Sequence, residues 1–343
     1  MADHRLQLCV IEGDGIGHEV IPAALDVLAA TGLAFDVQRA EAGWASFQAH
    51  GTALPEATLD IARHADAVLF GAVSSPSHRV AGYSSPIVAL RRKLNLFANL
   101  RPSVSWPIPT SRPDVDLLIV RENSEGLYLR REHREGDQAI AERLITRAGS
   151  ARVARVACEW ARQRRRHLTI VHKANVLPET CGLFRETALE VAADYPDLTV
   201  DEMLVDAMAM RLVTQPERFD VIVTTNMFGD ILSDEAAGLV GGLGLAPSAN
   251  LGATPTPALF EPVHGSAPDI AGQGIASPLA AFLSVAMLLD HIGSRETAAR
   301  VRAAVTEVLR HGPYTPDLGG DAGTTELTDM VEWYIREGIG DKE

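Results

Sequence analysis

The chain has 343 residues, 46% of them hydrophobic, which is enough for one large core or two domains. Its 45 acidic and 31 basic residues give a net charge of -14, which argues against nucleic acid and against an anionic membrane as partners. The 3 cysteines are widely spaced and no long apolar leader precedes the first turn, so we expect a cytoplasmic protein without disulfides.

The N-terminal part of the chain alternates between strands and helices. Residues 6–13 (LQLCVIEG) predict a strand, residues 18–32 a helix and residues 35–43 a second strand. A helix at 58–65 and a strand at 65–74 follow. This alternation favours an α/β sheet.

The middle of the chain supplies a second set of strands. They are predicted at 115–123, 167–175, 198–206 and 219–226, and helical stretches at 183–195 and 207–219 separate the last three. A Gly/Pro-rich segment at 241–274 then precedes an apolar run at 278–293. That run falls short of the ~18 residues of a membrane span, so we interpret it as a buried core helix.

Three acids in apolar surroundings predict a divalent metal site. Asp230 and Asp234 lie in TTNMFGDILSDEAAGL, which is typical of a strand end running into a helix, and a spacing of four puts both carboxylates on one helical face. Asp206 ends another apolar run and is the candidate third ligand. Ligands that are all oxygen suit Mg²⁺ or Mn²⁺. Solvated acids at helix starts are the alternative interpretation.

Arginines provide candidate anion contacts. Arg91, Arg101 and Arg121 each stand beside apolar residues, and guanidinium forks pair well with carboxylates. A single arginine of this kind more often forms a surface salt bridge. Three arginines together with a metal site predict a small substrate that carries two or three carboxylates.

A base and an acid can also be named. Strand alternation sends His172 and Lys173 to opposite faces, so only one of them can face a cleft. A lysine beside a cation can have a lowered pKa and act as a base. Tyr128 offers a phenol that could protonate an enol carbon, although ordinary aromatic packing is its alternative role.

Several long motifs, in order along essentially the whole chain, resemble one enzyme family. They are GDGIGHEV, LFANLRP, RENSEGLY, HKANV, VDAMAM, FGDILSD and EPVHGSAPDIAGQGIA. These motifs are similar to the metal-dependent β-decarboxylating dehydrogenases of 2-hydroxy acids, which act on isocitrate, 3-isopropylmalate, homoisocitrate and tartrate or malate. GDGIGHEV is not a Rossmann fingerprint, because His18 stands where the third glycine would be needed.

The resemblance implies an α/β, isopropylmalate dehydrogenase-like two-domain fold with a large mixed sheet flanked by helices, not a standard Rossmann fold. Residues 1–96 and 241–343 would form the cofactor-side domain, and residues 97–240 a central domain with the dimer interface. The active site is expected in the cleft between the domains.

The resemblance also implies roles for the candidate residues. The three arginines would hold the malate-like carboxylates, and the three aspartates would bind the metal. Tyr128 and Lys173 would be the catalytic pair. Lys173 and Asp206 are expected to reach into the neighbouring subunit's site, which implies a homodimer with shared sites, either alone or paired into tetramers.

The same resemblance implies NAD as cofactor. An acid at Asp269 would accept the adenosine ribose hydroxyls and disfavour a 2'-phosphate. The residues expected to line the cofactor groove are Ile16, His264, Gly265, Asp269, Ile270, Ala276 and Ser277. Ser277 departs from the asparagine of many relatives, and His264 has the alternative of a structural histidine.

Substrate choice is expected to depend on the loop SPSHRVAGYSSPIVALRR. Its part GYSSPIVALRR, together with IEGDGIGHEVIPAA, EAGW and GPYTPDLGGDAGT, is most similar to the homoisocitrate-oxidising branch, which implies production of 2-oxoadipate for lysine biosynthesis through aminoadipate. Some bacterial members have Arg where this chain has Val88, so another residue would have to meet the distal carboxylate. The remaining expected substrate contacts are Ser84, Ser85, Arg79 and Asn175. Oxidation of isocitrate or 3-isopropylmalate remains open, and a non-catalytic regulatory subunit is the alternative from another class.

Overall fold

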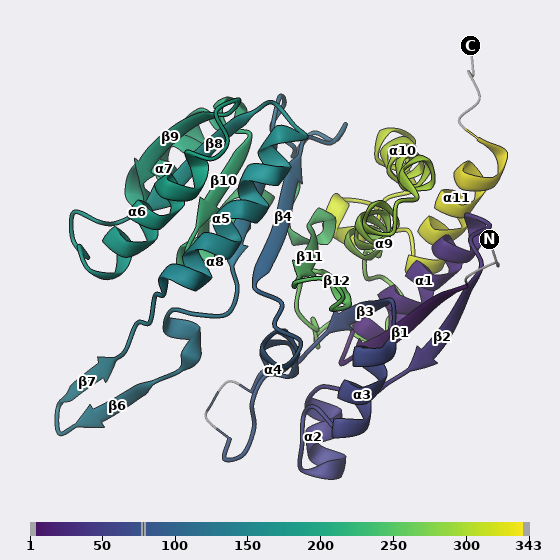
Figure 1. Cartoon of the computed structure of the whole chain (residues 1–343). Helices are drawn as coiled ribbons and strands as arrows, with labels where there is room; N and C mark the ends of the chain where they lie inside the picture. The colour runs from purple at the N-terminus through teal and green to yellow at the C-terminus, as the bar shows by residue number, and fades with distance from the viewer. Residues whose placement is uncertain (1–4, 77, 79, 339–343) are drawn as a thin grey trace. The chain divides into compact units, whose positions relative to one another are not determined.

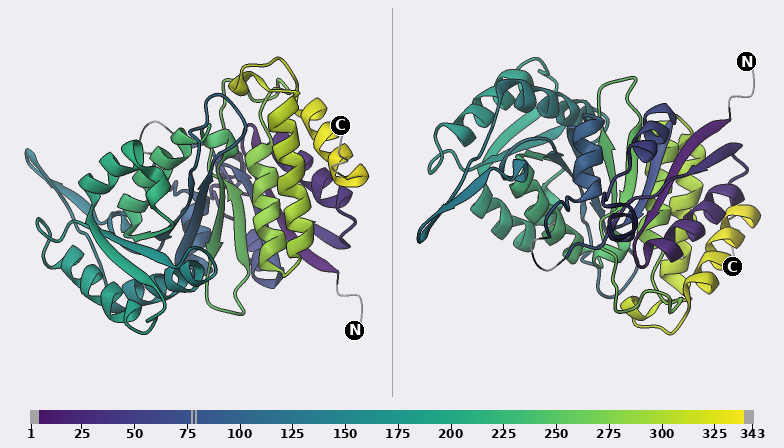
Figure 2. Two further views of the ribbon diagram at one scale, coloured as in Figure 1. Left: turned by 90° about the horizontal axis from the view of Figure 1, so that it is seen from above. Right: turned by 90° about the horizontal axis from the view of Figure 1, so that it is seen from below.

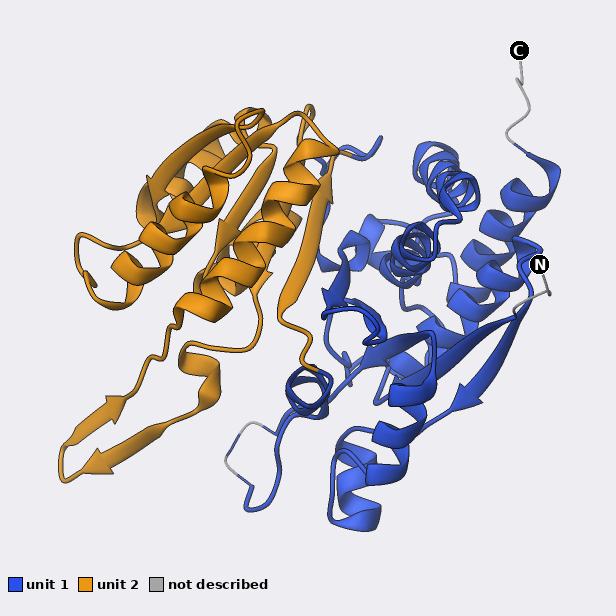
Figure 3. Ribbon diagram, viewed as in Figure 1, with its two compact units in different colours: residues 1–94, 106–111, 241–343 blue, residues 95–105, 112–240 orange. Residues whose placement is uncertain are grey.

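The computed structural model describes residues 5–76, 78 and 80–338, so the predicted substrate residue Arg79 lies outside the described residues. Figure 1 labels the helices and strands, and its colours follow the chain from the N-terminus to the C-terminus. The chain forms two compact units, coloured separately in Figure 3. Unit 1 comprises residues 1–94, 106–111 and 241–343, and unit 2 comprises residues 95–105 and 112–240.

The described residues of unit 1 form five strands in the order β2, β1, β3, β12, β11. Their bounds are Leu6–Gly13 (β1), Phe35–Arg39 (β2), Ala67–Ala72 (β3), Pro247–Leu251 (β11) and Ala258–Pro262 (β12). β1 pairs in parallel with β2 and β3, and β3 pairs in parallel with β12, whereas β11 is antiparallel to β12. Every residue of β3 is buried, as its uninterrupted apolar sequence predicts.

The helices of unit 1 pack on these strands and on one another. Their bounds are Gly17–Ala30 (α1), Trp44–His50 (α2), Glu56–His64 (α3), Pro86–Lys93 (α4), Leu279–His291 (α9), Arg295–His311 (α10) and Thr324–Glu337 (α11). α9 contacts β11, β12, α1 and α10, and ten of its 13 residues are buried. The predicted core helix at 278–293 is therefore confirmed. Among the described residues, none of the helices combines the length and apolar character needed to cross a membrane.

Unit 2 has five strands in the order β4, β5, β10, β8, β9, and a separate hairpin of β6 and β7. Their bounds are Ala98–Val104 (β4), Asp116–Glu122 (β5), Glu132–Glu135 (β6), Gln138–Ala141 (β7), His167–His172 (β8), Thr199–Leu204 (β9) and Val221–Thr224 (β10). β4 is antiparallel to β5, and the remaining pairs of the five-stranded set are parallel.

Two pairs of helices cover the strands of unit 2, one on either side (Figure 2). Their bounds are Arg147–Arg162 (α5), Thr180–Ala192 (α6), Val205–Thr214 (α7) and Asn226–Leu239 (α8). α5 packs on α6, β5 and β10, whereas α8 packs on α7, β4 and β5. Both units thus combine mixed strand pairing with flanking helices, and the predicted α/β fold with a mixed sheet is confirmed.

Some boundaries differ from the sequence predictions for local reasons. The helix predicted at 207–219 ends at Thr214, because Pro216 cannot continue it. The Gly/Pro-rich segment at 241–274 contains two strands, β11 and β12, that the sequence analysis missed. The arginine-rich run at 162–167 begins at the last residue of α5, where the side chain of Arg162 is exposed.

Candidate active site

The first turns of α8 carry two acids toward the strands of unit 2. Asp230 and Asp234 are one turn apart on this helix. The helix approaches the strands closely at Gly229, where a Cβ atom would lie 2.6 Å from Cγ of Arg121. A larger residue at this position would push α8 away from Arg121. The glycine therefore allows the short distance between α8, which carries Asp230, and the strand that carries Arg121.

Arg101 and Arg121 come from the antiparallel pair β4 and β5. In the register of these strands Asn99 lies opposite Arg121, so Arg101 and Arg121 share one face as a diagonal pair. Both guanidinium groups are buried, with Arg121 only 1% exposed. Buried arginines require acceptors for their five N–H groups, and α8 supplies acceptors to both of them.

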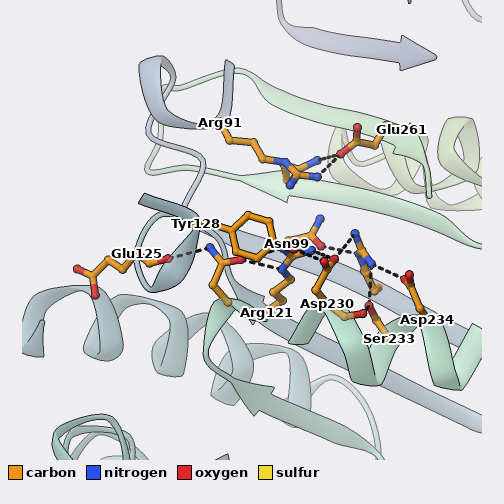
Figure 4. Close-up of polar contacts among 12 residues, drawn as sticks. Arg91, Asn99, Arg121, Glu125, Tyr128, Asp230, Ser233, Asp234 and Glu261 are labelled. Atoms are coloured by element: carbon orange, nitrogen blue, oxygen red, sulfur yellow. Dashed lines mark hydrogen bonds and ion pairs between the residues drawn. The ribbon is translucent and has the colours of Figure 1, made fainter. Parts of the chain in front are cut away.

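Asp230 is the shared acceptor of this group of side chains (Figure 4). Arg121 donates to its Oδ1, the Tyr128 hydroxyl donates to its Oδ2, and Nη2 of Arg101 lies 3.4 Å from Oδ1. Nη1 of Arg101 donates to Oδ1 of Asp234 at 2.9 Å. We call Arg101, Arg121, Tyr128, Asp230 and Asp234 the Asp230 cluster.

Polar side chains that the sequence analysis missed orient the two arginines. Asn226 Oδ1 accepts from Nε of Arg121 at 3.1 Å and from Nη2 at 2.8 Å. Asn99 Oδ1 accepts from Nε of Arg101 at 2.8 Å, and Ser233 Oγ accepts from its Nη1 at 2.7 Å. Within the TTNMFGDILSD segment, Asn226 lies one turn before Asp230, and Ser233 lies between Asp230 and Asp234. Their position next to the predicted acids could have identified them from the sequence.

The environment shifts the ionisation of two members of the Asp230 cluster. Burial, followed by the hydrogen bond to Asp230, raises the pKa of the Tyr128 phenol, so this group stays protonated well above neutral pH. Burial also raises the pKa of Asp234, and the charge of Asp230 adds to this effect, while Arg101 opposes it. Tyr128 is therefore held as a proton donor, and its ring also lies 4.9 Å from the guanidinium carbon of Arg121.

Lys173 and Asp206 form a second pair in unit 2. Nζ of Lys173, just after β8, donates to Oδ1 of Asp206 in the first turn of α7 at 2.5 Å. This hydrogen bond lowers the pKa of the Asp206 carboxyl. As strand alternation predicts, His172 is buried while the Lys173 side chain is 23% exposed. Asn175 lies exposed in the loop that follows.

The three predicted metal ligands do not meet within one copy of the chain. Over residues 5–76, 78 and 80–338, no group of three His, Cys, Asp or Glu side chains is close enough to hold a metal ion. Asp230 and Asp234 nevertheless supply oxygen donors that suit Mg²⁺ or Mn²⁺. The two acids are balanced by two arginines, so a substrate with several carboxylates would leave excess negative charge that a divalent cation would offset.

Arg91 belongs to unit 1, where α4 and β12 hold it. Its Nη2 donates to Oε1 of Glu261 at 2.7 Å, and Asn250 Nδ2 donates to the same oxygen at 2.8 Å. The Nε of Arg91 is buried without a hydrogen-bond partner among the described residues. Of the other predicted substrate residues in this region, Ser85 is buried just before α4 and Ser84 is exposed. Val88 is half-buried within the helix.

The predicted cofactor residues of unit 1 lie on two segments. Ile16 precedes α1, and its N–H donates to Ser266 O at 2.9 Å. The others lie between β12 and α9, where Ala276 and Ser277 are buried and Gly265 and Asp269 are exposed, with Ile270 half-buried. Burial lowers the pKa of His264, and its buried Nε2 has no hydrogen-bond partner among the described residues.

Comparisons with known proteins match almost the whole chain to dehydrogenases of one family. The isocitrate/isopropylmalate dehydrogenase family matches residues 7–331. The isocitrate/homoisocitrate dehydrogenase of Thermus thermophilus is 58% identical over 326 residues, which cover 95% of this chain and 97% of that protein. The homoisocitrate dehydrogenase of Methanocaldococcus jannaschii is 50% identical, covering 97% of this chain and 98% of that protein. A crystal structure of isocitrate dehydrogenase from Methylococcus capsulatus superimposes with a TM-score of 0.91 at 45% identity, covering 96% of this chain and 99% of that one.

Proposed function

The chain belongs to the isocitrate/isopropylmalate dehydrogenase family, and from this premise we propose that it oxidises homoisocitrate with NAD⁺ and releases 2-oxoadipate and CO₂. Family membership makes it an oxidative decarboxylating dehydrogenase of a hydroxy acid. The observation that carries the proposed chemistry is the Asp230 cluster, in which two buried arginines, two acids and a protonated tyrosine converge. The choice of homoisocitrate as substrate is supported by the names of the relatives.

Each residue has a role in the proposed reaction. Arg101 and Arg121, with Arg91, bind substrate carboxylates through their N–H groups. Asp230 and Asp234, with Asp206 of the partner subunit, would hold Mg²⁺ or Mn²⁺, and the metal would supply Lewis-acid polarisation of the substrate oxygens.

Lys173 of the partner subunit would accept the proton of the substrate hydroxyl. NAD⁺, which Ile16 and residues 263–278 would hold, would supply the acceptor for the hydride. The C–C bond to the β-carboxylate then breaks and CO₂ leaves. Tyr128 donates a proton to the carbon that keeps the electron pair.

An exposed apolar surface supports the homodimer. Six large apolar side chains are exposed on the loop after β8, on α7 and on α8: Val176, Leu177, Met210, Val213, Met227 and Ile231. Exposed apolar surface of this kind marks protein–protein contact. Lys173 and Asp206 lie on the same elements, so a second copy docked there would bring both residues to the interface.

Substrate and cofactor choice can be tested with one set of assays. We expect NADH formation with Mg²⁺ to be most efficient, as kcat/KM, on homoisocitrate, with isocitrate second and 3-isopropylmalate third. The isocitrate/homoisocitrate and homoisocitrate enzymes among the relatives support this order. Preference for 3-isopropylmalate would show that the apolar Ile87 and Val88 decide specificity.

NADP⁺ should be the poorer cofactor because Asp269 disfavours a 2'-phosphate. Lack of activity on all three acids would favour a regulatory subunit.

Substitution of Tyr128 by Phe tests the proton donor. We expect steady-state turnover to fall by about 10²- to 10³-fold, since general acids contribute on this scale. Hydride transfer precedes protonation, so a burst of NADH close to one equivalent per site should survive in rapid-mixing experiments. Tyr334→Phe, on α11 of unit 1, is the matched control and should behave as wild type. Loss of the burst together with turnover would assign Tyr128 to an earlier step.

A further inference from the structure

The segment between β12 and α9, residues 263–278, carries most of the residues proposed to bind NAD⁺, yet it contains no helix or strand. Such a segment depends on outside groups to fix its backbone. One anchor is Thr324 at the start of α11, which donates from N–H to Gly274 O at 2.8 Å and from Oγ1 to Ala276 O at 2.6 Å. A second anchor comes from α1.

The carboxylate of Glu19 binds two backbone groups of this segment. Its Oε1 accepts from the N–H of Gly272 at 2.6 Å, and its Oε2 accepts from the N–H of Gly274 at 2.9 Å. The two glycines have φ values of 79° and 68°, a conformation that other L-residues rarely adopt. This backbone turns both N–H groups toward a single anion, as in backbone nests. Because the acceptor is charged, the two hydrogen bonds are stronger than neutral ones.

Helix electrostatics alone do not account for these contacts. Glu19 lies in the first turn of α1, where the helix dipole favours any acid. A carboxylate directed into solvent would interact with the helix dipole equally well. Instead, Glu19 is half-buried and each of its two oxygens is engaged by a different glycine. The side chain therefore joins the start of α1 to residues 263–278.

We propose that Glu19 is a positioning residue for the nicotinamide cofactor. It fixes residues 263–278 against α1, so that Ile16, three positions before Glu19, and the cofactor residues of that segment keep one arrangement. A segment ordered in advance loses less conformational freedom when the cofactor binds. The inference rests on the proposed NAD⁺-dependent function, and it predicts an effect on cofactor affinity rather than on the chemical steps.

The test is NADH binding to Glu19→Ala, measured by fluorescence titration without any hydroxy acid. We expect the Kd to rise about ten-fold, which is the scale of a change of 1.4 kcal/mol in binding. The KM for NAD⁺ should rise in parallel, while kcat at saturating NAD⁺ and the KM for the hydroxy acid stay close to wild type. Glu19→Gln keeps one acceptor oxygen and should give an intermediate Kd.

Glu296→Ala is the matched control, because Glu296 is an exposed acid in the first turn of α10. It should leave NADH binding unchanged. Far-UV circular dichroism checks the fold of each variant, and if Glu19→Ala fails to fold, Glu19→Gln decides the question. Wild-type NADH affinity in both folded Glu19 variants overturns the inference and leaves the proposed function intact. Failure of the wild-type protein to bind NADH or NADPH overturns the proposed function itself.

Discussion

Lys173→Met is expected to reduce NADH formation by at least about 10³-fold, because methionine keeps the apolar stem but removes the proposed base for the substrate hydroxyl. Asp206 remains available in this variant. The hydrogen bond from Lys173 lowers the Asp206 pKa, so losing it returns that pKa toward its ordinary acidic value, and the carboxyl stays ionised at neutral pH. The loss should therefore appear in kcat rather than in metal dependence.

Lys93→Met is the control for this substitution. Lys93 is an exposed lysine on α4 whose ammonium lies 3.3 Å from Glu56, and removing it should leave turnover unchanged. Turnover near wild type in Lys173→Met would show that Lys173 is not the base and that another group accepts the hydroxyl proton.

Mixing two inactive variants tests whether Lys173 acts across the dimer. A mixed dimer of Lys173→Met and Tyr128→Phe subunits contains one site with both residues intact if the lysine comes from the partner. Random exchange of subunits in a two-fold dimer should then restore about a quarter of the wild-type activity. With mixed dimers verified by native mass spectrometry, absence of recovery would assign Lys173 to the site of its own subunit.

Asp230→Asn is expected to lower activity by at least about 10³-fold and to abolish its dependence on Mg²⁺, since a metal ion contributes several kcal/mol to such steps. The amide keeps an acceptor oxygen but removes the charge that faces Arg121, a residue with only 1% exposure. We also expect destabilisation of about 1–3 kcal/mol, because a buried guanidinium would lose its counter-charge. Metal titration of kcat and thermal unfolding measure the two effects separately.

Asp290→Asn is a close control for Asp230→Asn. Asp290 lies on α9, pairs with Arg302, and has a side chain that is 31% exposed, the same fraction as that of Asp230. This substitution should change stability only slightly and leave Mg²⁺ dependence intact. An Asp230→Asn enzyme that still responds to Mg²⁺ with wild-type affinity would exclude Asp230 as a metal ligand.

Local sequence patterns were sufficient to predict the elements that are almost entirely apolar. The continuous apolar run of β3 and the apolar helix α9 were predicted, because burial on all sides leaves a sequence with few polar residues. β4 was missed since Pro102 interrupts its pattern, and β11 was missed because it begins with Pro247 inside a Gly/Pro-rich segment. α5 was missed because arginines are scattered among its small residues.

The sequence by itself determined the type of most elements, the family, and the identity of the acids, arginines, lysine and tyrosine, since side-chain chemistry and spacing on one element are local properties. Only the tertiary structure decided which of them meet. The register of β4 and β5 brings Arg101 and Arg121 to Asp230, more than a hundred positions away along the chain, and Glu19 reaches Gly272 across a separation of 253 residues. Such contacts depend on strand pairing and helix packing between distant segments, which no local pattern encodes.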